Sequence, residues 1–333
     1  MMLVVLVMIL REASSLRQQV GRAKALKTMS PPASPRADPV TTKMPKTTRE
    51  EIRGLVRMAR PNSIPMGAAA VGIGAFGARH VANAAGGGLA LRLALGTALT
   101  SITTAGSMLM NDYHDHREGV DTPLTKPGRP LVTGEVRPAT VKFVLKWAYA
   151  VHLCLLCLLD SALMRMWVLG NTLMTYLYSV HLKPITGLKN VVCAFIVSMA
   201  VGLGAVAAAG AGAGLEALKS VWRPMACVAG LIWHREILMD IKDLDGDASV
   251  GLKTLPVVFG RDDALLASLL PLALATGAAV TSRPAMLATA PLLLQARAAL
   301  QAKHTNFQHP ALSRALERAP LYLLITLIAL TAL

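Results

Sequence analysis

Apolar stretches long enough to cross a membrane recur along the chain from Pro61 onward, with short polar segments between them. A helix needs about 20 apolar residues to cross roughly 30 Å of hydrocarbon. Nine stretches fit, near residues 61–81, 88–110, 139–159, 162–180, 189–211, 218–239, 263–281, 285–302 and 319–333. The last two are the weakest, because the final one is short and 285–302 contains Arg297. Since peptide groups in hydrocarbon need internal partners, the pattern predicts an all-α, multi-span membrane bundle of about nine transmembrane helices.

Composition agrees with a membrane protein. Of the 333 residues, 53% are hydrophobic and only 16% are charged, and the mean hydropathy is +0.49. The net charge of +15 could indicate nucleic-acid binding, but the basic residues lie in the N-terminal segment and between the apolar stretches. No soluble domain with interleaved aromatic residues is present to use them. We therefore expect membrane lipid, and no nucleic acid, as a partner.

The N-terminal segment, residues 1–49, differs from the rest of the chain. It is basic, contains Ser and Pro, and has only Glu12 and Asp38 as acids. This composition is typical of an organelle transit segment, and we expect import into a plastid rather than a mitochondrion. The alternative is a disordered basic tail on an anionic membrane surface. The predicted domains are this extension and a membrane domain over residues 50–333.

Two acidic clusters stand out against this apolar background. The first cluster, Asn111-Asp112-x-x-Asp115 followed by Asp121, ends the second stretch, and the second cluster, Asp240-x-x-Asp243-x-x-x-Asp247, ends the sixth. On a helix, a spacing of three residues places Asp112 and Asp115 on one face, and spacings of three and seven residues place Asp240, Asp243 and Asp247 on one face. Carboxylates crowded at the ends of membrane helices need a cation or water to stabilise them. Hard oxygen ligands favour Mg²⁺ bridging to phosphate oxygens, so we predict a magnesium-diphosphate site.

Helix parity predicts that these clusters share one side of the membrane. Segments after even-numbered stretches return to the side of the N-terminal segment, and a third polar segment, 178–190, follows the fourth stretch. Its Lys183 and Lys189 can balance the charge of a diphosphate. The alternative of a transition-metal site at His114 and His116 is weaker, because alternate residues on a helix point in different directions.

At this point the sequence resembles the UbiA superfamily of intramembrane prenyltransferases over roughly residues 56–333. The resemblance rests on the two acidic motifs and on four further segments: Arg60-Pro61, Gly128-Arg129-Pro130-Leu131-Val132-Thr133-Gly134, His181-Leu182-Lys183-Pro184 and Gly251-Leu252-Lys253-Thr254-Leu255-Pro256.

The resemblance implies roles for individual residues. Asp112, Asp115, Asp243 and Asp247, together with Asn111, would bind Mg²⁺ and diphosphate, and these four acids would be catalytic. Asp121 and Asp240 would be supporting metal ligands, although Asp121 lies six residues after Asp115 where many members have a spacing of four. The candidate phosphate-side cations are Arg129, Lys183 and Lys189, which together with Asn111 would bind the substrate.

The implied activity is Mg²⁺-dependent transfer of a prenyl group from an allylic prenyl diphosphate to a lipophilic acceptor. The acceptor stays open, because the Asp121 spacing is similar to the dihydroxynaphthoate branch and the second cluster is similar to the ether-lipid and chlorophyll branches. A terpene cyclase of the same fold is the alternative, although aromatic residues, which would stabilise its carbocations, make up only 4% of the chain. A non-catalytic cation carrier is a third alternative, but its acids would be expected near the middle of the membrane.

Overall fold

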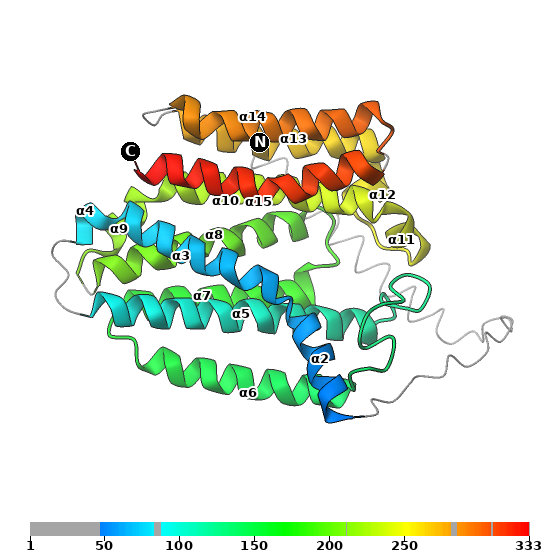
Figure 1. The fold of residues 1–333 in the computed structure, drawn as a ribbon, viewed down its shortest axis with the longest axis horizontal. Coiled ribbons are helices and arrows are strands. Elements are labelled where there is room, and N and C mark those ends of the chain that lie inside the picture. The colour runs from blue at the N-terminus through cyan, green and yellow to red at the C-terminus, as the bar shows by residue number, and fades with distance from the viewer. Residues whose placement is uncertain (1–46, 83–87, 211, 281–284, 308, 333) are drawn as a thin grey trace, which may run out of the picture. The chain divides into compact units, whose positions relative to one another are not determined.

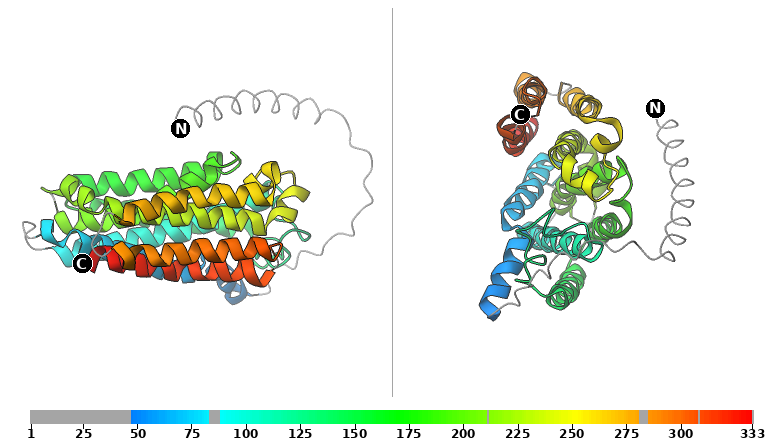
Figure 2. Two further views of the ribbon diagram at one scale, coloured as in Figure 1. Left: turned by 90° about the horizontal axis from the view of Figure 1, so that it is seen from above. Right: turned by 90° about the vertical axis from the view of Figure 1, so that its right-hand side faces the viewer.

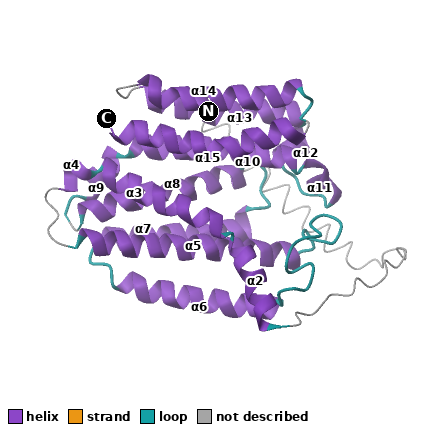
Figure 3. Cartoon of the chain, viewed as in Figure 1, coloured by secondary structure: helices purple, strands orange, loops and turns teal. Residues whose placement is uncertain are grey.

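The computed structural model describes residues 47–82, 88–210, 212–280, 285–307 and 309–332, and these residues form helices and no strand (Figure 3). The long helices are α3 (Ile64–Gly77), α5 (Leu89–Arg117), α6 (Pro138–Cys157), α7 (Ala162–Leu177), α8 (Leu188–Ala209), α10 (Trp222–Lys242), α13 (Arg261–Val280), α14 (Ala285–His304) and α15 (His309–Ala332). Within the described part, each of the nine predicted apolar stretches overlaps one of these long helices, and stretches 61–81 and 218–239 also extend into short helices beside them. The prediction of an all-α fold is confirmed.

Short helices connect the long ones. They are α2 (Thr48–Ala59), η1 (Pro61–Ser63), α4 (Arg79–Ala82), η2 (Tyr178–Leu182), α9 (Gly214–Ser220), α11 (Leu244–Ser249) and α12 (Leu255–Phe259). In Figure 1, α11 and α12 lie with the segment that follows α5 at one end of the long helices, and α4 and α9 lie at the other end. We call the end with α11 and α12 the motif end, because α5 and α10 both finish there.

The prediction of about nine transmembrane helices is not confirmed as a count. By length and composition, four described helices can cross a membrane, namely α5, α6, α8 and α13. Helices α3 and α7 have 14 and 16 residues, which is short of a full bilayer crossing. Helix α10 carries Arg235 and Glu236 among its apolar residues. Large apolar side chains exposed on the bundle, such as Trp147, Leu173 and Leu270, are those expected to face lipid.

Helix α8 forms the centre of the bundle, and it packs against α3, α5, α7 and α10. Figure 2 shows the long helices side by side in its left view, and its right view looks along their axes. The contact with α3 is between backbones: a Cβ atom added to Gly74 would lie 1.9 Å from the carbonyl oxygen of Val201, and one added to Gly204 would lie 1.8 Å from that of Val71. Small residues allow membrane helices to approach this closely.

Helix α2 is an amphipathic helix that precedes the first long helix. Thr47 caps it by accepting a hydrogen bond from the backbone N–H of Glu50, and Glu51 and Met58 are buried against the bundle. The Glu51 carboxylate accepts hydrogen bonds from the Arg137 guanidinium at 2.9 and 3.1 Å and from the Thr140 hydroxyl at 2.6 Å. After α2 the chain turns at Arg60, which has a left-handed φ of 48°. This turn directs the Arg60 side chain toward the motif end.

Candidate active site

The first cluster begins in the last turns of α5. Asp112 is buried, and its Oδ1 accepts hydrogen bonds from Nη1 of Arg129 at 2.6 Å and from Nη2 of Arg60 at 3.2 Å. One turn later, both carboxylate oxygens of Asp115 accept from Nζ of Lys183, at 2.5 and 2.6 Å. Each acid on this face therefore has a cation from another segment beside it.

Asp121 returns to the same cluster in spite of its unusual spacing. Gly119 adopts a positive φ of 76°, and the backbone N–H groups of Val120 and Asp121 then donate to the carbonyl oxygen of Asp115 at 2.9 and 3.1 Å. Oδ2 of Asp121 lies 3.8 Å from Nε of Arg129, which also binds Asp112. Burial raises the pKa of the Asp121 carboxyl, and Arg129 opposes the rise. The turn thus places a third acid beside the other two.

The second cluster lies where α10 ends and α11 begins. Asp240 is buried, and it accepts hydrogen bonds from Nζ of Lys189 at 2.6 Å and from Nδ2 of Asn190 at 2.9 Å. Asp243 follows the last residue of α10 and accepts from Nζ of Lys126 at 3.1 Å. Asp247 is half-buried in α11, where burial raises its pKa and Lys189 opposes the rise.

The three polar segments predicted to share one side of the membrane do meet at the motif end. Lys183 and Lys189, from the third segment, contact the first and second clusters respectively. Lys126, which follows the first cluster in sequence, contacts Asp243 of the second. These ion pairs bring the three segments together at one end of the bundle.

The predicted metal ligands do not form a closed metal-binding group. In the ranges that the structure describes, no three His, Cys, Asp or Glu side chains gather closely enough to hold one metal ion, and this holds for His114 and His116 too. Three oxygens of the first cluster are nevertheless buried without a hydrogen-bond donor: Oδ1 of Asn111, Oδ2 of Asp112 and Oδ2 of Asp121. Buried oxygens without donors are the groups that a hard cation would satisfy.

The structure adds three residues that sequence reasoning did not assign to the site. Arg60 contacts Asp112, Lys126 contacts Asp243, and Asn190 contacts Asp240. Arg60 lies in the Arg60-Pro61 segment that supported the resemblance, and Asn190 is adjacent to Lys189 in sequence. The sequence indicated these residues only by their position next to the motifs.

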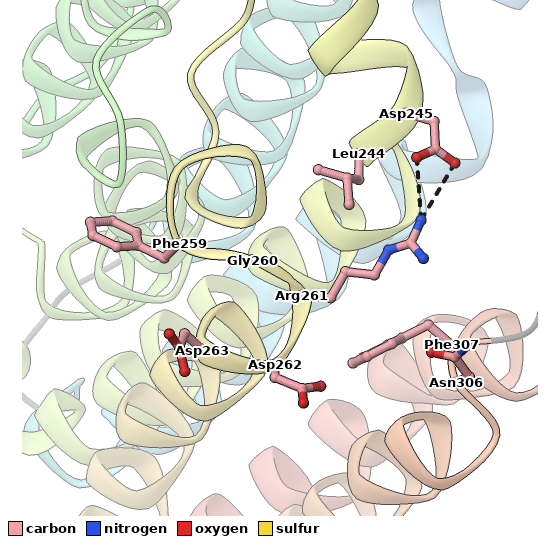
Figure 4. Close-up of a pocket in the computed structure, with 9 residues that line it drawn as sticks. All are labelled: Leu244, Asp245, Phe259, Gly260, Arg261, Asp262, Asp263, Asn306 and Phe307. Carbon is pink, nitrogen blue, oxygen red and sulfur yellow. Dashed lines mark hydrogen bonds and ion pairs between the residues drawn. The ribbon is translucent and has the colours of Figure 1, made fainter.

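Two pockets open at the motif end. The smaller, of about 180 Å³, lies beside the second cluster, and its lining includes Lys126, Asp243 and Asp247. The larger, of about 590 Å³, is open to the surface and has none of the predicted site residues in its lining (Figure 4). Figure 4 shows Arg261 directed to Asp245, with Oδ1 and Oδ2 at 3.3 and 3.4 Å from Nη2. We associate the site with the smaller pocket, because it is lined by two acids of the second cluster and by Lys126, which follows the first cluster in sequence.

A helical bundle with outward apolar side chains and paired acids and bases at one end defines a multi-pass membrane protein with a charged site at the membrane boundary. The sequence profile of the UbiA prenyltransferase family matches residues 70–326. The chain belongs to this family, so the predicted class of enzyme, an intramembrane prenyltransferase, is confirmed.

Individual relatives agree with this assignment. The chain is 31% identical to a digeranylgeranylglyceryl phosphate synthase of Methanopyrus kandleri, over 67% of this chain and 76% of the relative. Among solved structures, a UbiA homologue of Aeropyrum pernix in its apo form superposes with a TM-score of 0.62 at 22% identity, covering 81% of this chain and 96% of that one. A homologue of Archaeoglobus fulgidus bound to DMAPP and Mg²⁺ superposes with a TM-score of 0.55 at 17% identity, covering 84% and 99%. These structures share the fold.

The coarser part of the predicted location, an integral membrane protein, is supported. The membrane location stands, but an organellar one, with the plastid preferred, has no support from these relatives, which are archaeal proteins. The segment on which that prediction rested, residues 1–49, lies almost entirely outside the described residues. The proposed boundary between an extension and a membrane domain stays a prediction.

Proposed function

We propose that this protein transfers a prenyl group from an allylic prenyl diphosphate to the hydroxyl group of a glycerol-phosphate lipid. The observation that carries the proposal is the alternation of acids and cations at the motif end, where Lys126, Lys183 and Lys189 each bridge to an acid from a distant segment. A polyanion held by magnesium needs both kinds of group within reach. The Methanopyrus relative, named for a glycerol-phosphate lipid product, supports the choice of acceptor.

Mg²⁺ fits the residues present. Asn111, Asp112, Asp115 and Asp121 on one side, and Asp240, Asp243 and Asp247 on the other, would hold it, and the three buried oxygens without donors belong to the first group. Bound Mg²⁺ would neutralise the diphosphate and so make it a better leaving group.

The cations of the chain orient the diphosphate and stabilise the charge that develops on it. Arg129 is suited to the task, because its planar guanidinium can donate to two oxygens at once. Lys183, Lys189 and Lys126 can turn from their carboxylates to phosphate oxygens, since each has a flexible stem. The prenyl tail would lie along the apolar interior of the bundle, where water does not reach the reacting carbon.

The test is transfer in proteoliposomes that contain the purified protein, MgCl₂ and labelled geranylgeranyl diphosphate. Three parallel reactions receive geranylgeranylglyceryl phosphate, dihydroxynaphthoate or no acceptor. A labelled diether lipid in the first reaction alone is the expected result. A labelled naphthoate product would move the acceptor to the quinone branch. A cyclic hydrocarbon or alcohol formed without acceptor would replace the proposal by the cyclase alternative, which gains no support from the relatives.

A further inference from the structure

Arg235 and Glu236 form a charged pair within α10 that the diphosphate site does not use. Nη1 of Arg235 lies 3.1 Å from Oε1 of Glu236. Glu236 precedes Asp240 by four residues, so it lies on the same face of the helix, about 6 Å further from the motif end. The pair therefore lies one helical turn deeper in the bundle than the second cluster.

The side chains of this pair are partly exposed, whereas adjacent residues of α10 are buried. The side chains of Arg235 and Glu236 are 32% and 25% exposed, whereas His234, Ile237 and Leu238 in the same helix are fully buried. A charged pair whose only role was to link helices would be expected to contact another helix. This pair instead joins two adjacent residues of one helix, which adds little to helix stability because adjacent positions point apart.

The surroundings of Glu236 come from the helices that carry the diphosphate site. Lys189 pairs with Asp240, and Cys193, four residues after Lys189, lies one turn deeper along α8. Glu236 is close enough to Tyr178, Cys193 and Asp240 to interact electrostatically with each of them. Glu236 thus lies near Tyr178 and Cys193, one helical turn further from the motif end than Asp240. A prenyl diphosphate bound at the motif end would extend its reacting carbon toward this region.

Ionisable groups at this depth are costly unless they serve a ligand or a partner. We infer that Arg235 and Glu236 bind the polar head of the acceptor, with Arg235 donating to its phosphate and Glu236 accepting the proton of its hydroxyl group. This inference rests on the proposed function and specifies which residues select its acceptor. The two classes of group match: a guanidinium suits a phosphate, and a carboxylate suits an alcohol that must lose a proton.

The reaction balances without another reactant. The oxygen of the acceptor hydroxyl forms a bond to the terminal carbon of the prenyl group, and the bond from that carbon to the diphosphate oxygen breaks. The electron pair of the broken bond leaves with the diphosphate. The hydroxyl proton passes to Glu236, which returns it to water after the product leaves.

The test separates binding of the donor from transfer to the acceptor. Glu236→Gln, Glu236→Asp, Arg235→Gln and Arg235→Lys are compared with wild type and with Glu216→Gln, a control that removes an acid paired with Lys219 outside the site. Binding of labelled geranylgeranyl diphosphate with MgCl₂ and transfer to geranylgeranylglyceryl phosphate are both measured. Thermal unfolding in detergent verifies that each variant is folded.

We expect Glu236→Gln to lower kcat by about a hundredfold, as for loss of a general base, with donor binding unchanged. Glu236→Asp restores part of the rate. Arg235→Gln raises the KM for the acceptor by at least about tenfold, and Arg235→Lys raises it less. The Glu216→Gln control behaves as wild type.

Equal loss of donor binding and transfer in Glu236→Gln would assign the pair to the diphosphate site and overturn the inference. Wild-type transfer in both Gln variants would overturn it too, while leaving the proposed function intact. If the wild-type protein transfers only to dihydroxynaphthoate, the proposed acceptor fails first and the inference fails with it.

Discussion

Asp112 and Asp243 occupy comparable places near the ends of α5 and α10, yet their side chains are 4% and 36% exposed respectively. Asp112 lies inside a continuous helix and binds two arginines. Asp243 follows the last residue of α10 and binds one lysine. The first cluster is therefore held in place before a ligand arrives, whereas the outer part of the second can adjust around one.

The acids of the second cluster also differ from one another in burial. Asp240, its inner acid, is buried and bound by Lys189 and Asn190, much as Asp112 is bound by its arginines. Asp247, its outer acid, lies in the six-residue helix α11. The order of burial indicates that rigidity decreases from the inner acid to the outer one.

Removal of magnesium tests whether the two clusters share a metal site, and we expect it to have the largest effect on transfer activity. Treatment of proteoliposomes with EDTA abolishes transfer, because the diphosphate loses the counterions that make it a leaving group. Added MgCl₂ restores transfer, and labelled product is the measurement. Full activity in excess EDTA would contradict a shared metal site.

Substitution of single acids tests the difference between the clusters. We expect Asp112→Asn to lower kcat/KM by about a thousandfold and Asp243→Asn by about a hundredfold, because loss of the buried carboxylate leaves two arginines without its charge, whereas the more exposed Asp243 binds one lysine. Steady-state transfer assays give both values. Asn variants are preferred to Ala, because they retain most of the side-chain volume. Near-normal activity in both variants would argue against the assignment of these acids to the metal site.

Substitution of the cations beside the two clusters is expected to change kcat/KM less than substitution of the acids. Arg129 contacts Asp112 and Asp121 together, so Arg129→Lys lowers kcat/KM by about 10- to 100-fold, since a single ammonium group cannot reproduce the planar guanidinium. Lys126→Arg has little effect at the more exposed second cluster. A matched loss in the two variants would mean that the clusters do not differ in rigidity.

Acid pH gives the smallest effect, at the anchor of α2. Hydrogen bonds from Arg137 lower the pKa of Glu51 from its usual 4.5 to about 2. Because the folded-state pKa is depressed, this stabilisation is complete above pH 4.5 and is lost as the pH falls toward 2. Thermal unfolding in detergent at several values of pH measures it. Glu51→Gln removes this pH dependence, whereas the control Glu216→Gln retains it.

The sequence predicted the helices, because they depend on a local apolar pattern, whereas the role of the acids stays a prediction. The nine apolar stretches gave helices, and spacing placed Asp112 beside Asp115 and Asp240 near Asp243. The partners of these acids could not be predicted from spacing. Lys126 meets Asp243 across 117 residues, and Arg60 meets Asp112 across 52. Such pairs depend on how the helices pack together.

Asp121 shows a second reason why the sequence did not predict the whole site. Its role was less secure in the sequence, because it lies six residues after Asp115 where many members of the family have a spacing of four. A positive φ at Gly119 ends the helix and returns the chain to the cluster. The number of transmembrane helices was also hard to predict. The charged pair Arg235 and Glu236 makes α10 less apolar, yet the helix forms.

The glycine contact between α3 and α8 limits how this protein can be redesigned. Helix α3 follows Arg60 after the short helix η1, and the first turn of α8 contains Lys189 and Asn190, so one backbone contact joins the supports of both acidic clusters. An engineer who wished to lengthen or shorten the space for the prenyl tail would have to leave residues 74 and 204 as glycine. Changes on the lipid-facing sides of α6 and α7 would leave this contact intact, so those helices are the better place to begin.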